Sequence, residues 1–239
     1  MSRDTRLARF AHLPEFDATR SILPEPQASL WPALGDVPDQ FVLYGGTALA
    51  LRLGHRQSVD FDFFAAHEFT PAELLADLGW LGRPEVVDMS DNSLVVIEQG
   101  GVQLAFYGGM RLQAVAEPSV AHENGLLIAS VFDLAATKAK ALLDRSEWRD
   151  YVDIASLIES GHALADIIGY AAAAFDPLFI FPAPVFLRNL VWFNDGTAPD
   201  VSAASRAVLE AAVRGLDLTD IPLVEPWRGT IDPVWANRR

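Results

Sequence analysis

The pattern of hydrophobic and polar positions changes its period near residue 130. Before that point, short apolar runs are separated by glycine, proline and polar turns, which is typical of strands connected by short helices. Beyond it, apolar residues recur every three to four positions, which predicts helices. We therefore predict an α+β fold with two domains. Residues 1–129 form a mixed sheet flanked by helices, and residues 130–239 form a mainly helical domain.

The first domain is predicted to hold five strands, at 41–44, 60–64, 86–87, 94–97 and 102–107. A turn at Gly45 and Gly46 leads from the first strand into a short helix from Thr47 to Leu53, which Gly54 ends as a C-cap. A second helix is predicted at 71–79, and Gln99-Gly100-Gly101 joins the last two strands as a hairpin. Residues 1–40 are broken by prolines and predict only short helical turns.

The second domain is predicted to hold five helices, at 130–144, 149–159, 162–174, 185–193 and 200–214. Ser130 and Asp133 resemble a capping box at the start of the first helix. Residues 175–184 are apolar and punctuated by prolines, which predicts a connection. The last 20 residues, with several prolines and tryptophans, predict an extended tail packed on the domain.

Composition narrows the classes of function. Of the 239 residues, 51% are hydrophobic, which is ample for a folded core, and the formal charge is -14. That charge argues against broad, sequence-independent binding to nucleic acid, since such binding comes from many lysine and arginine contacts to phosphate. No apolar stretch approaches the roughly 18 residues of a membrane span. Zero cysteines suit a reducing compartment, so we expect a cytoplasmic protein that does not bind membranes.

Two aspartates, Asp60 and Asp62, are the strongest candidates for chemistry. Side chains alternate along a strand, so both carboxylates leave one face about 6 to 7 Å apart, while Phe61 and Phe63 enter the core on the other. Two carboxylates of this kind can hold Mg²⁺ together with substrate phosphates. The alternative is an exposed strand edge with two solvated acids.

Gly45, Gly46 and Thr47 open the first predicted helix. A helix N-terminus offers unpaired N–H groups and a partial positive charge that suit a triphosphate, and glycine lets the backbone approach it closely. The alternative is an ordinary tight turn with Thr47 as N-cap. Arg52 and Arg56 follow this turn, and each either reaches phosphate or closes the helix against its dipole.

A basic stripe is a third candidate. On one continuous helix, Arg145 and Arg149 would each lie within roughly 20° of Lys138, and the three could neutralise triphosphate charge. A solvated helix face is the alternative, and a break near Ser146 would separate these residues. Asp150 and Asp153 lie one turn apart on the next predicted helix, where they can orient Lys138 or Arg149, act as a base, or pair as surface charges.

Other catalytic motifs are absent from the sequence. The five histidines show no metal-ligand spacing, and there is no nucleophile elbow, dinucleotide-binding glycine fingerprint or Walker lysine motif.

The order and spacing of these residues resemble a known family. The run 45–64, then Asp133 with Lys138, then 149–154 resembles the AbiEii/AbiGii toxin family of nucleotidyltransferases, within the DNA polymerase beta-like superfamily. The resemblance covers about residues 40–160. It implies a nucleotidyltransferase fold with a helical C-terminal part, dependence on NTP and on Mg²⁺ (or Mn²⁺), and membership of an abortive-infection toxin–antitoxin pair with a cognate antitoxin. Some toxins of the family add nucleotides to the 3′ end of tRNA.

The resemblance also implies roles for individual residues. Its glycine-serine motif corresponds to Gly45, Gly46 and Thr47, and its Ser-x-Asp-x-Asp motif to Ser58, Asp60 and Asp62. Its lysine corresponds to Lys138, and its final aspartate motif to Asp150 and Asp153. Together with Arg56 and with Arg145 of the basic stripe, this gives the following predicted site. The catalytic residues are Asp60, Asp62, Lys138, Asp150 and Asp153, and the nucleotide-binding residues are Gly45, Gly46, Thr47, Arg56, Ser58 and Arg145.

One departure from the superfamily concerns a third carboxylate on a neighbouring strand. Here the equivalent run, 101–107, offers only Gln103 and Ala105 on the relevant face. Asp150 or Asp153 then takes its place, or the site uses one metal, or catalysis is weak; Glu98 is a further stand-in.

We therefore expect a nucleotidyltransferase that moves NMP from an NTP to a hydroxyl acceptor such as RNA or tRNA. A protein of the same fold that binds nucleotides or partners without turnover is the first alternative. An acidic patch that only binds a basic partner, such as an antitoxin, is the second.

Overall fold

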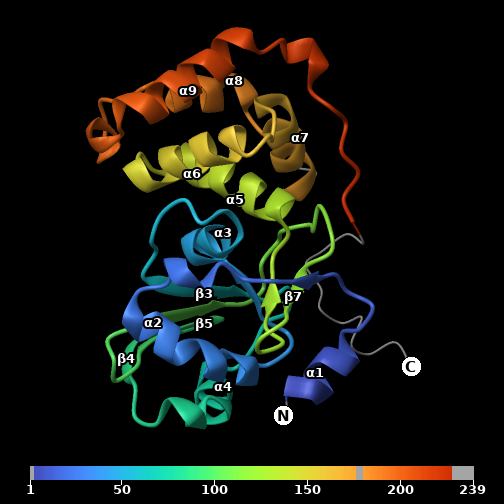
Figure 1. The fold of residues 1–239 in the computed structure, drawn as a ribbon, viewed down its shortest axis with the longest axis vertical. Coiled ribbons are helices and arrows are strands. Elements are labelled where there is room, and N and C mark those ends of the chain that lie inside the picture. Colours follow the sequence, from blue (N-terminus) through green and yellow to red (C-terminus); the bar gives the residue numbers. More distant parts are fainter. Residues whose placement is uncertain (1–2, 176–179, 228–239) are drawn as a thin grey trace. The chain divides into compact units, whose positions relative to one another are not determined.

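The computed structural model describes residues 3–175 and 180–227 of the chain (Figure 1). These residues form two compact units, one built from 3–112 and 117–130 and the other from 113–116 and 131–227. The first unit contains the sheet and the second contains the long helices. Division into two domains after residue 129 stays a prediction.

The first unit is organised around one mixed sheet. Its strands, among the described residues, are β1 (Glu15–Phe16), β2 (Val42–Tyr44), β3 (Asp60–Phe64), β4 (Glu85–Ser90), β5 (Ser93–Ile97), β6 (Gln103–Tyr107), β7 (Ser119–Ala121) and β8 (Leu127–Ile128). They lie in the order β1-β7-β8-β2-β3-β6-β5-β4. The β3 strand is antiparallel to β2 and parallel to β6, and β5 and β6 form the predicted hairpin. The predicted α+β fold class with a mixed sheet is confirmed.

The two faces of β3 differ as its sequence predicts. Phe61 and Phe63 are fully buried, whereas the residues between and beside them are partly exposed. The ring of Phe63 stacks on Phe106 of β6 at 4.8 Å between centroids, and Phe41 meets Phe106 edge-on at 5.1 Å. Phe61, Phe63 and Phe106 therefore belong to the core on one face of the sheet. Asp60 and Asp62 lie on the other face, which we call the polar face.

Short helices flank the sheet. They are α1 (Arg3–Arg9), α2 (Glu25–Leu30), α3 (Gly45–Leu53) and α4 (Pro71–Asp77), with 3₁₀ turns η1 (Arg20–Ile22), η2 (Trp31–Asp36) and η3 (Gly79–Leu81). Figure 1 shows α3 on one side of the sheet and α4 on the other. Proline stands at the start of α4, where its missing N–H costs nothing. The predicted short helical turns before residue 40 are confirmed.

The structure differs from the sequence-based prediction in three places in this unit. The strands β1, β7 and β8 were not predicted, because two or three residues carry no readable alternation and depend on pairing with distant strands. The strand β4 extends beyond the predicted 86–87 to Glu85–Ser90. The helix predicted from Thr47 begins at Gly45, so Thr47 lies inside α3 and is not its N-cap.

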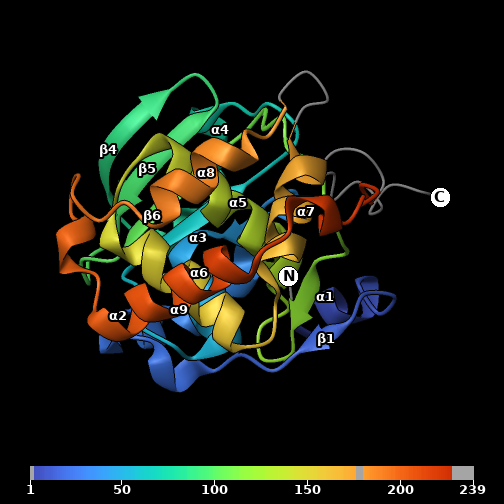
Figure 2. The same cartoon turned by 90° about the horizontal axis from the view of Figure 1, so that it is seen from above.

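The second unit is a helical assembly, as predicted. Its elements are α5 (Val131–Asp144), α6 (Trp148–Glu159), α7 (Leu164–Ala174), α8 (Ala183–Leu190), α9 (Ala203–Gly215), η4 (Ala198–Asp200) and η5 (Leu218–Asp220). The α5 helix packs against α6, α7 and α8, and α9 lies beside α6 (Figure 2).

Two further predictions concern this unit, namely the capping box at the start of α5 and the packed tail. Asp133 accepts a hydrogen bond from the backbone N–H of Val115 at 2.7 Å. Its capping box with Ser130 stays a prediction. In the predicted tail, residues 221–227 lack regular secondary structure. Pro222 lies against Gly169 of α7, and the Trp227 N–H donates to the Ala114 carbonyl at 2.6 Å. The part of the tail beyond 227 and residues 176–179 of the predicted connection lie outside the described residues.

Candidate active site

The β3 strand places Asp60 and Asp62 on the polar face of the sheet. Both are partly exposed and alternate with buried phenylalanines. In the antiparallel pairing of β2 with β3, Tyr44 lies opposite Asp62, so the chain enters α3 directly beside this carboxylate. The Thr47 hydroxyl donates to the Asp60 carbonyl at 2.5 Å, which ties the first turn of α3 to β3.

Glycine is required where α3 begins. Gly45 has a φ of +74°, and a Cβ built on it would lie 2.1 Å from Oδ2 of Asp62. A Cβ on Gly46 would lie 2.8 Å from the Ser58 hydroxyl and 2.9 Å from the Arg56 guanidinium. The backbone therefore approaches the carboxylate, hydroxyl and guanidinium as closely as a glycine allows.

One unit thus brings together seven of the predicted site residues: Gly45, Gly46, Thr47, Arg56, Ser58, Asp60 and Asp62. Their donor atoms suit a divalent cation, because the carboxylates of Asp60 and Asp62 lie on one face of β3. The backbone turn beside them leaves no room for a Cβ. Among residues 3–175 and 180–227, no group of three His, Cys, Asp or Glu side chains is placed to hold a metal. The roles of these residues stay predictions.

The close approach at Gly45 gives a testable expectation. Gly45→Ala should move the Asp62 carboxylate and weaken Mg²⁺–nucleotide binding at least about 10-fold, and its positive φ should cost about 1 kcal/mol of stability. Gly101→Ala is a matched control, since Gly101 has a φ of +84° with nothing within 4 Å of an added Cβ. Urea denaturation and titration calorimetry measure both effects. Equal nucleotide affinity in the two variants would contradict the proposed contact.

The polar face also shows the departure from the superfamily pattern. Gln103 pairs with Asp60 and Ala105 with Asp62 in the β3–β6 register, so no carboxylate of β6 lies opposite the two aspartates. The suggested stand-in, Glu98, accepts hydrogen bonds from the Gly100 N–H at 2.7 Å and the Val102 N–H at 3.2 Å. Its carboxylate therefore caps the turn between β5 and β6.

Arg52 has a structural role. Its guanidinium donates to the carbonyls of Ala129 at 2.8 Å and Ile128 at 3.3 Å and to the Ser119 hydroxyl at 3.1 Å. These bonds fasten the last turn of α3 to β7 and β8. The two predicted alternatives, contact with phosphate and closing of the helix against its dipole, did not include this anchoring role.

The second unit holds the other predicted residues, in a buried ionic cluster. The Lys138 ammonium lies 3.0 Å from Asp150 and 2.7 Å from Asp153, and both aspartates are fully buried. Arg145 also binds Asp150, with Nε at 2.9 Å. Burial alone would lower the pKa of Lys138, but the charges and hydrogen bonds of Asp153 and Asp150 together raise it. The two aspartates therefore orient a charged Lys138 and are not surface charges.

The basic stripe does not form. The α5 helix ends at Asp144 and α6 begins at Trp148, so Lys138, Arg145 and Arg149 do not lie on one helix. Arg149 instead pairs with Glu147 at 3.1 Å. Contact of Lys138 or Arg145 with a nucleotide stays a prediction.

Sequence reasoning missed Tyr107 as a residue of the polar face. Tyr107 pairs with Phe64 in the β3–β6 register, on the face of the two aspartates. Burial raises the pKa of its phenol, and the charges of Asp62, Asp88 and Asp60 raise it further. A signal was present, because Tyr107 stands two residues after Ala105 and shares its parity.

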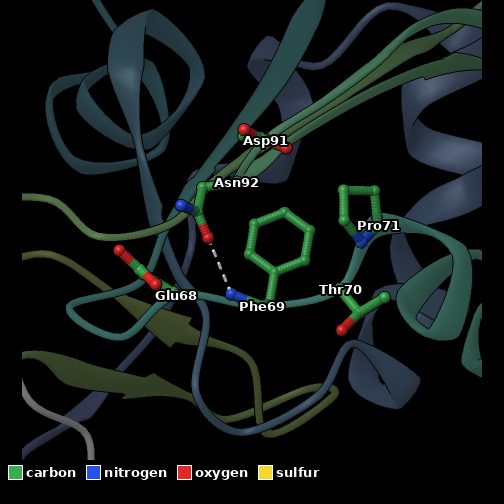
Figure 3. A pocket seen from close by; sticks show the side chains of 6 residues that line it. All are labelled: Glu68, Phe69, Thr70, Pro71, Asp91 and Asn92. Atoms are coloured by element: carbon green, nitrogen blue, oxygen red, sulfur yellow. Dashed lines mark hydrogen bonds between the residues drawn. The ribbon is translucent and has the colours of Figure 1, made fainter.

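A cavity of about 430 Å³ lies elsewhere in the first unit (Figure 3). Its lining residues are Glu68, Phe69, Thr70, Pro71, Asp91 and Asn92. The Asn92 side chain accepts the Phe69 N–H at 2.9 Å and so ties the turn between β4 and β5 to the segment before α4. None of the predicted site residues lines this cavity.

No helix in the described part of the chain is long and apolar enough to cross a membrane.

Comparison with known proteins places this geometry in a family. Residues 33–117 match the family described as "Nucleotidyl transferase AbiEii toxin, Type IV TA system". An uncharacterised protein of Aquifex aeolicus is 32% identical over 160 residues, which cover 66% of this chain and 75% of the relative.

Two solved structures share the fold. One is described as a nucleotidyltransferase from H. pylori, with 18% identity, a TM-score of 0.50, and coverage of 78% of this chain and 91% of the other. The second is MenT4, a nucleotidyltransferase toxin from Mycobacterium tuberculosis, with 15% identity, a TM-score of 0.50, and coverage of 92% and 91%. With the matched segment spanning Gly45, Asp60 and Asp62, the chain belongs to the nucleotidyl transferase AbiEii toxin family.

Proposed function

We propose that this protein transfers a nucleoside monophosphate from an NTP to a hydroxyl of an acceptor RNA, such as tRNA, and releases pyrophosphate. In this proposal the protein is the toxin of an abortive-infection pair and has a cognate antitoxin. The observation that supports this best is the pair Asp60 and Asp62 on the polar face of β3, against the backbone of Gly45. The family supports nucleotidyl transfer, and the acceptor and the antitoxin are part of the proposal.

Residues of the first unit bind the cation and the triphosphate in this proposal. Asp60 and Asp62 hold Mg²⁺ or Mn²⁺, which when bound offsets the charge of the phosphates and of the leaving pyrophosphate. The N–H groups at the start of α3, that of Thr47 among them, bind the triphosphate, helped by Arg56 and Ser58. The Thr47 side chain is buried and holds this turn against β3.

The cluster of the second unit has its own roles in the proposal. Lys138 stabilises the triphosphate charge, and Asp150 and Asp153 hold its ammonium in place. Asp153 also serves as the candidate base, and Arg145 adds a second cation beside Asp150.

The direct test is incubation with each labelled NTP, Mg²⁺ and total tRNA. We expect label in RNA with the wild-type protein and background label with Asp60→Ala. Equal labelling by both proteins would remove Asp60 from the mechanism. Label in neither, with Mg²⁺–NTP binding intact, would favour the alternative below.

A nucleotide-binding protein without turnover is the second candidate. The observation that favours it is the β3–β6 register, which sets Gln103 and Ala105 opposite the two aspartates, where the superfamily has a third carboxylate. Calorimetry that shows Mg²⁺–NTP binding, together with no product for any NTP, would support this candidate.

A further inference from the structure

Two aromatic side chains share the face of the catalytic aspartates. Phe64 follows Asp62 by two residues on β3, and it pairs with Tyr107 in the β3–β6 register. Because parity sets the face, Asp60, Asp62 and Phe64 point the same way, with about 6.6 Å between successive members. Phe64 and Tyr107 therefore lie next to Asp62, on the side away from Ser58.

The rings pack together, and the innermost of them, Tyr44, is buried. Tyr44, which is 2% exposed, stacks on Phe64 at 4.8 Å between centroids and 17° between ring planes. Tyr107 meets Phe64 edge-on, at 6.0 Å and 71°. Phe64 and Tyr107 themselves are partly exposed. We call these three residues the aromatic shelf.

Tyr44 belongs to the buried core of the first unit, whereas Phe64 and Tyr107 are partly exposed. Phe61, Phe63 and Phe106 fill the core from the opposite face and are fully buried. The last turn of α3 is fastened by Arg52 to β7 and β8, on the other side of β2 from β3 and β6. The partly exposed rings of Phe64 and Tyr107, beside two carboxylates, are therefore candidates for ligand binding.

Resting on the proposed function, we propose that Phe64 and Tyr107 bind a nucleobase by stacking, and so position a nucleoside beside the phosphate held at Asp60 and Asp62. Every base has a π-face, so stacking tolerates different bases and suits a site that must hold a nucleoside without reading its edge. The spacing agrees, since a nucleobase is separated from its own phosphates by a sugar. The base belongs either to the NTP or to the terminal nucleotide of the acceptor.

The test compares ligands that have and lack a base. Affinities of wild type, Phe64→Leu and Tyr107→Leu are measured by calorimetry with Mg²⁺ and each of ATP, GTP, CTP and UTP, and with inorganic tripolyphosphate. If the NTP base lies on the shelf, the variants bind NTP about 5- to 100-fold more weakly and tripolyphosphate unchanged. Phe64→Tyr should restore binding.

If the acceptor base lies on the shelf, NTP affinity stays unchanged and the KM for tRNA rises by a similar factor with kcat nearly constant. Phe69→Leu is the control, because Phe69 is also partly exposed and packs edge-on with a neighbouring ring, Phe41, at 5.3 Å. Phe69 lines the separate cavity of Figure 3, so both affinities should survive its replacement.

The proposal that the aromatic shelf binds a nucleobase is overturned if the wild type binds NTP and both variants keep the wild-type NTP affinity and the wild-type KM for tRNA. It is also overturned if the variants lose tripolyphosphate and NTP affinity equally, which would indicate structural damage. Failure of the wild-type protein to bind Mg²⁺–NTP or to label RNA would instead overturn the proposed function, and the shelf with it.

Discussion

Asp62→Asn is expected to lower the rate of nucleotidyl transfer at least about 100-fold and to leave the fold intact. A carboxylate that holds a divalent cation supplies several kcal/mol of charge stabilisation, and about 2.7 kcal/mol already corresponds to about 100-fold in rate. Asparagine keeps the size of the side chain beside Gly45 but not its charge. Because Asp62 is partly exposed, its replacement should cost little stability. Single-turnover rates with labelled NTP and thermal unfolding measure the two effects.

Asp88→Asn is the matched control for this prediction. Asp88 also carries its charge near Tyr107, but it lies on β4, an edge strand that β6 and β5 separate from β3. Its carboxylate accepts hydrogen bonds from Ser93 at 2.7 Å and Ser90 at 3.0 Å. We expect its replacement to keep the rate within about 3-fold, since long-range charge effects of exposed groups are screened. Equal losses in the two variants would contradict a specific role for Asp62.

Lys138→Met is expected to lower the free energy of unfolding by about 3–5 kcal/mol, because it leaves Asp150 and Asp153 buried without the ammonium between them. Methionine keeps the length of the side chain and removes its charge. Urea denaturation of both proteins gives the difference. A loss below about 1 kcal/mol, the size typical of a surface ion pair, would show that the cluster does not hold the helices together.

Lys140→Met is the control, since Lys140 is the other lysine of the chain and also lies on α5. It pairs with Asp144 one turn away, at the surface. We expect a change of about 0.5 kcal/mol or less.

The pH dependence of the Lys138 effect has a defined sign. The pKa of Lys138 is raised in the folded protein above its ordinary value of 10.5. A raised folded-state pKa stabilises the fold fully below the unfolded pKa, and this stabilisation is lost as pH rises through the folded value. The difference between wild type and Lys138→Met should therefore stay constant between about pH 7 and 9 and narrow at higher pH. A difference that widens above 10.5 would contradict this assignment.

Local patterns predicted the part of the site that depends on one strand and one turn. The alternation in Asp60 to Phe64 correctly separated the carboxylates from the buried phenylalanines, since parity within a strand needs no knowledge of the rest of the fold. The turn at Gly45 was also predicted, but the start of α3 was placed two residues late. The φ of +74° at Gly45 and its contact with Asp62 are consequences of strand pairing, which the sequence does not display.

Features that depend on packing between distant elements were left open by the sequence, which allowed Asp150 and Asp153 to orient Lys138 or Arg149, to act as a base, or to pair as surface charges. Lys138 and Asp153 meet because α5 packs against α6, and no helical period encodes that crossing. The break between the helices predicted at 130–144 and 149–159 is confirmed, and it separates the residues of the basic stripe. The short strands β7 and β8 exist only through their partners.

The most direct test of the central claim is calorimetric titration of NTP into the wild-type protein and into the double variant Asp60→Asn/Asp62→Asn, each with Mg²⁺ and with a chelator. We expect the wild type to bind NTP only with Mg²⁺ and the double variant not to bind it, and circular dichroism checks that the double variant keeps its fold. Binding of equal strength in all four titrations would show that these aspartates hold no cation for the nucleotide.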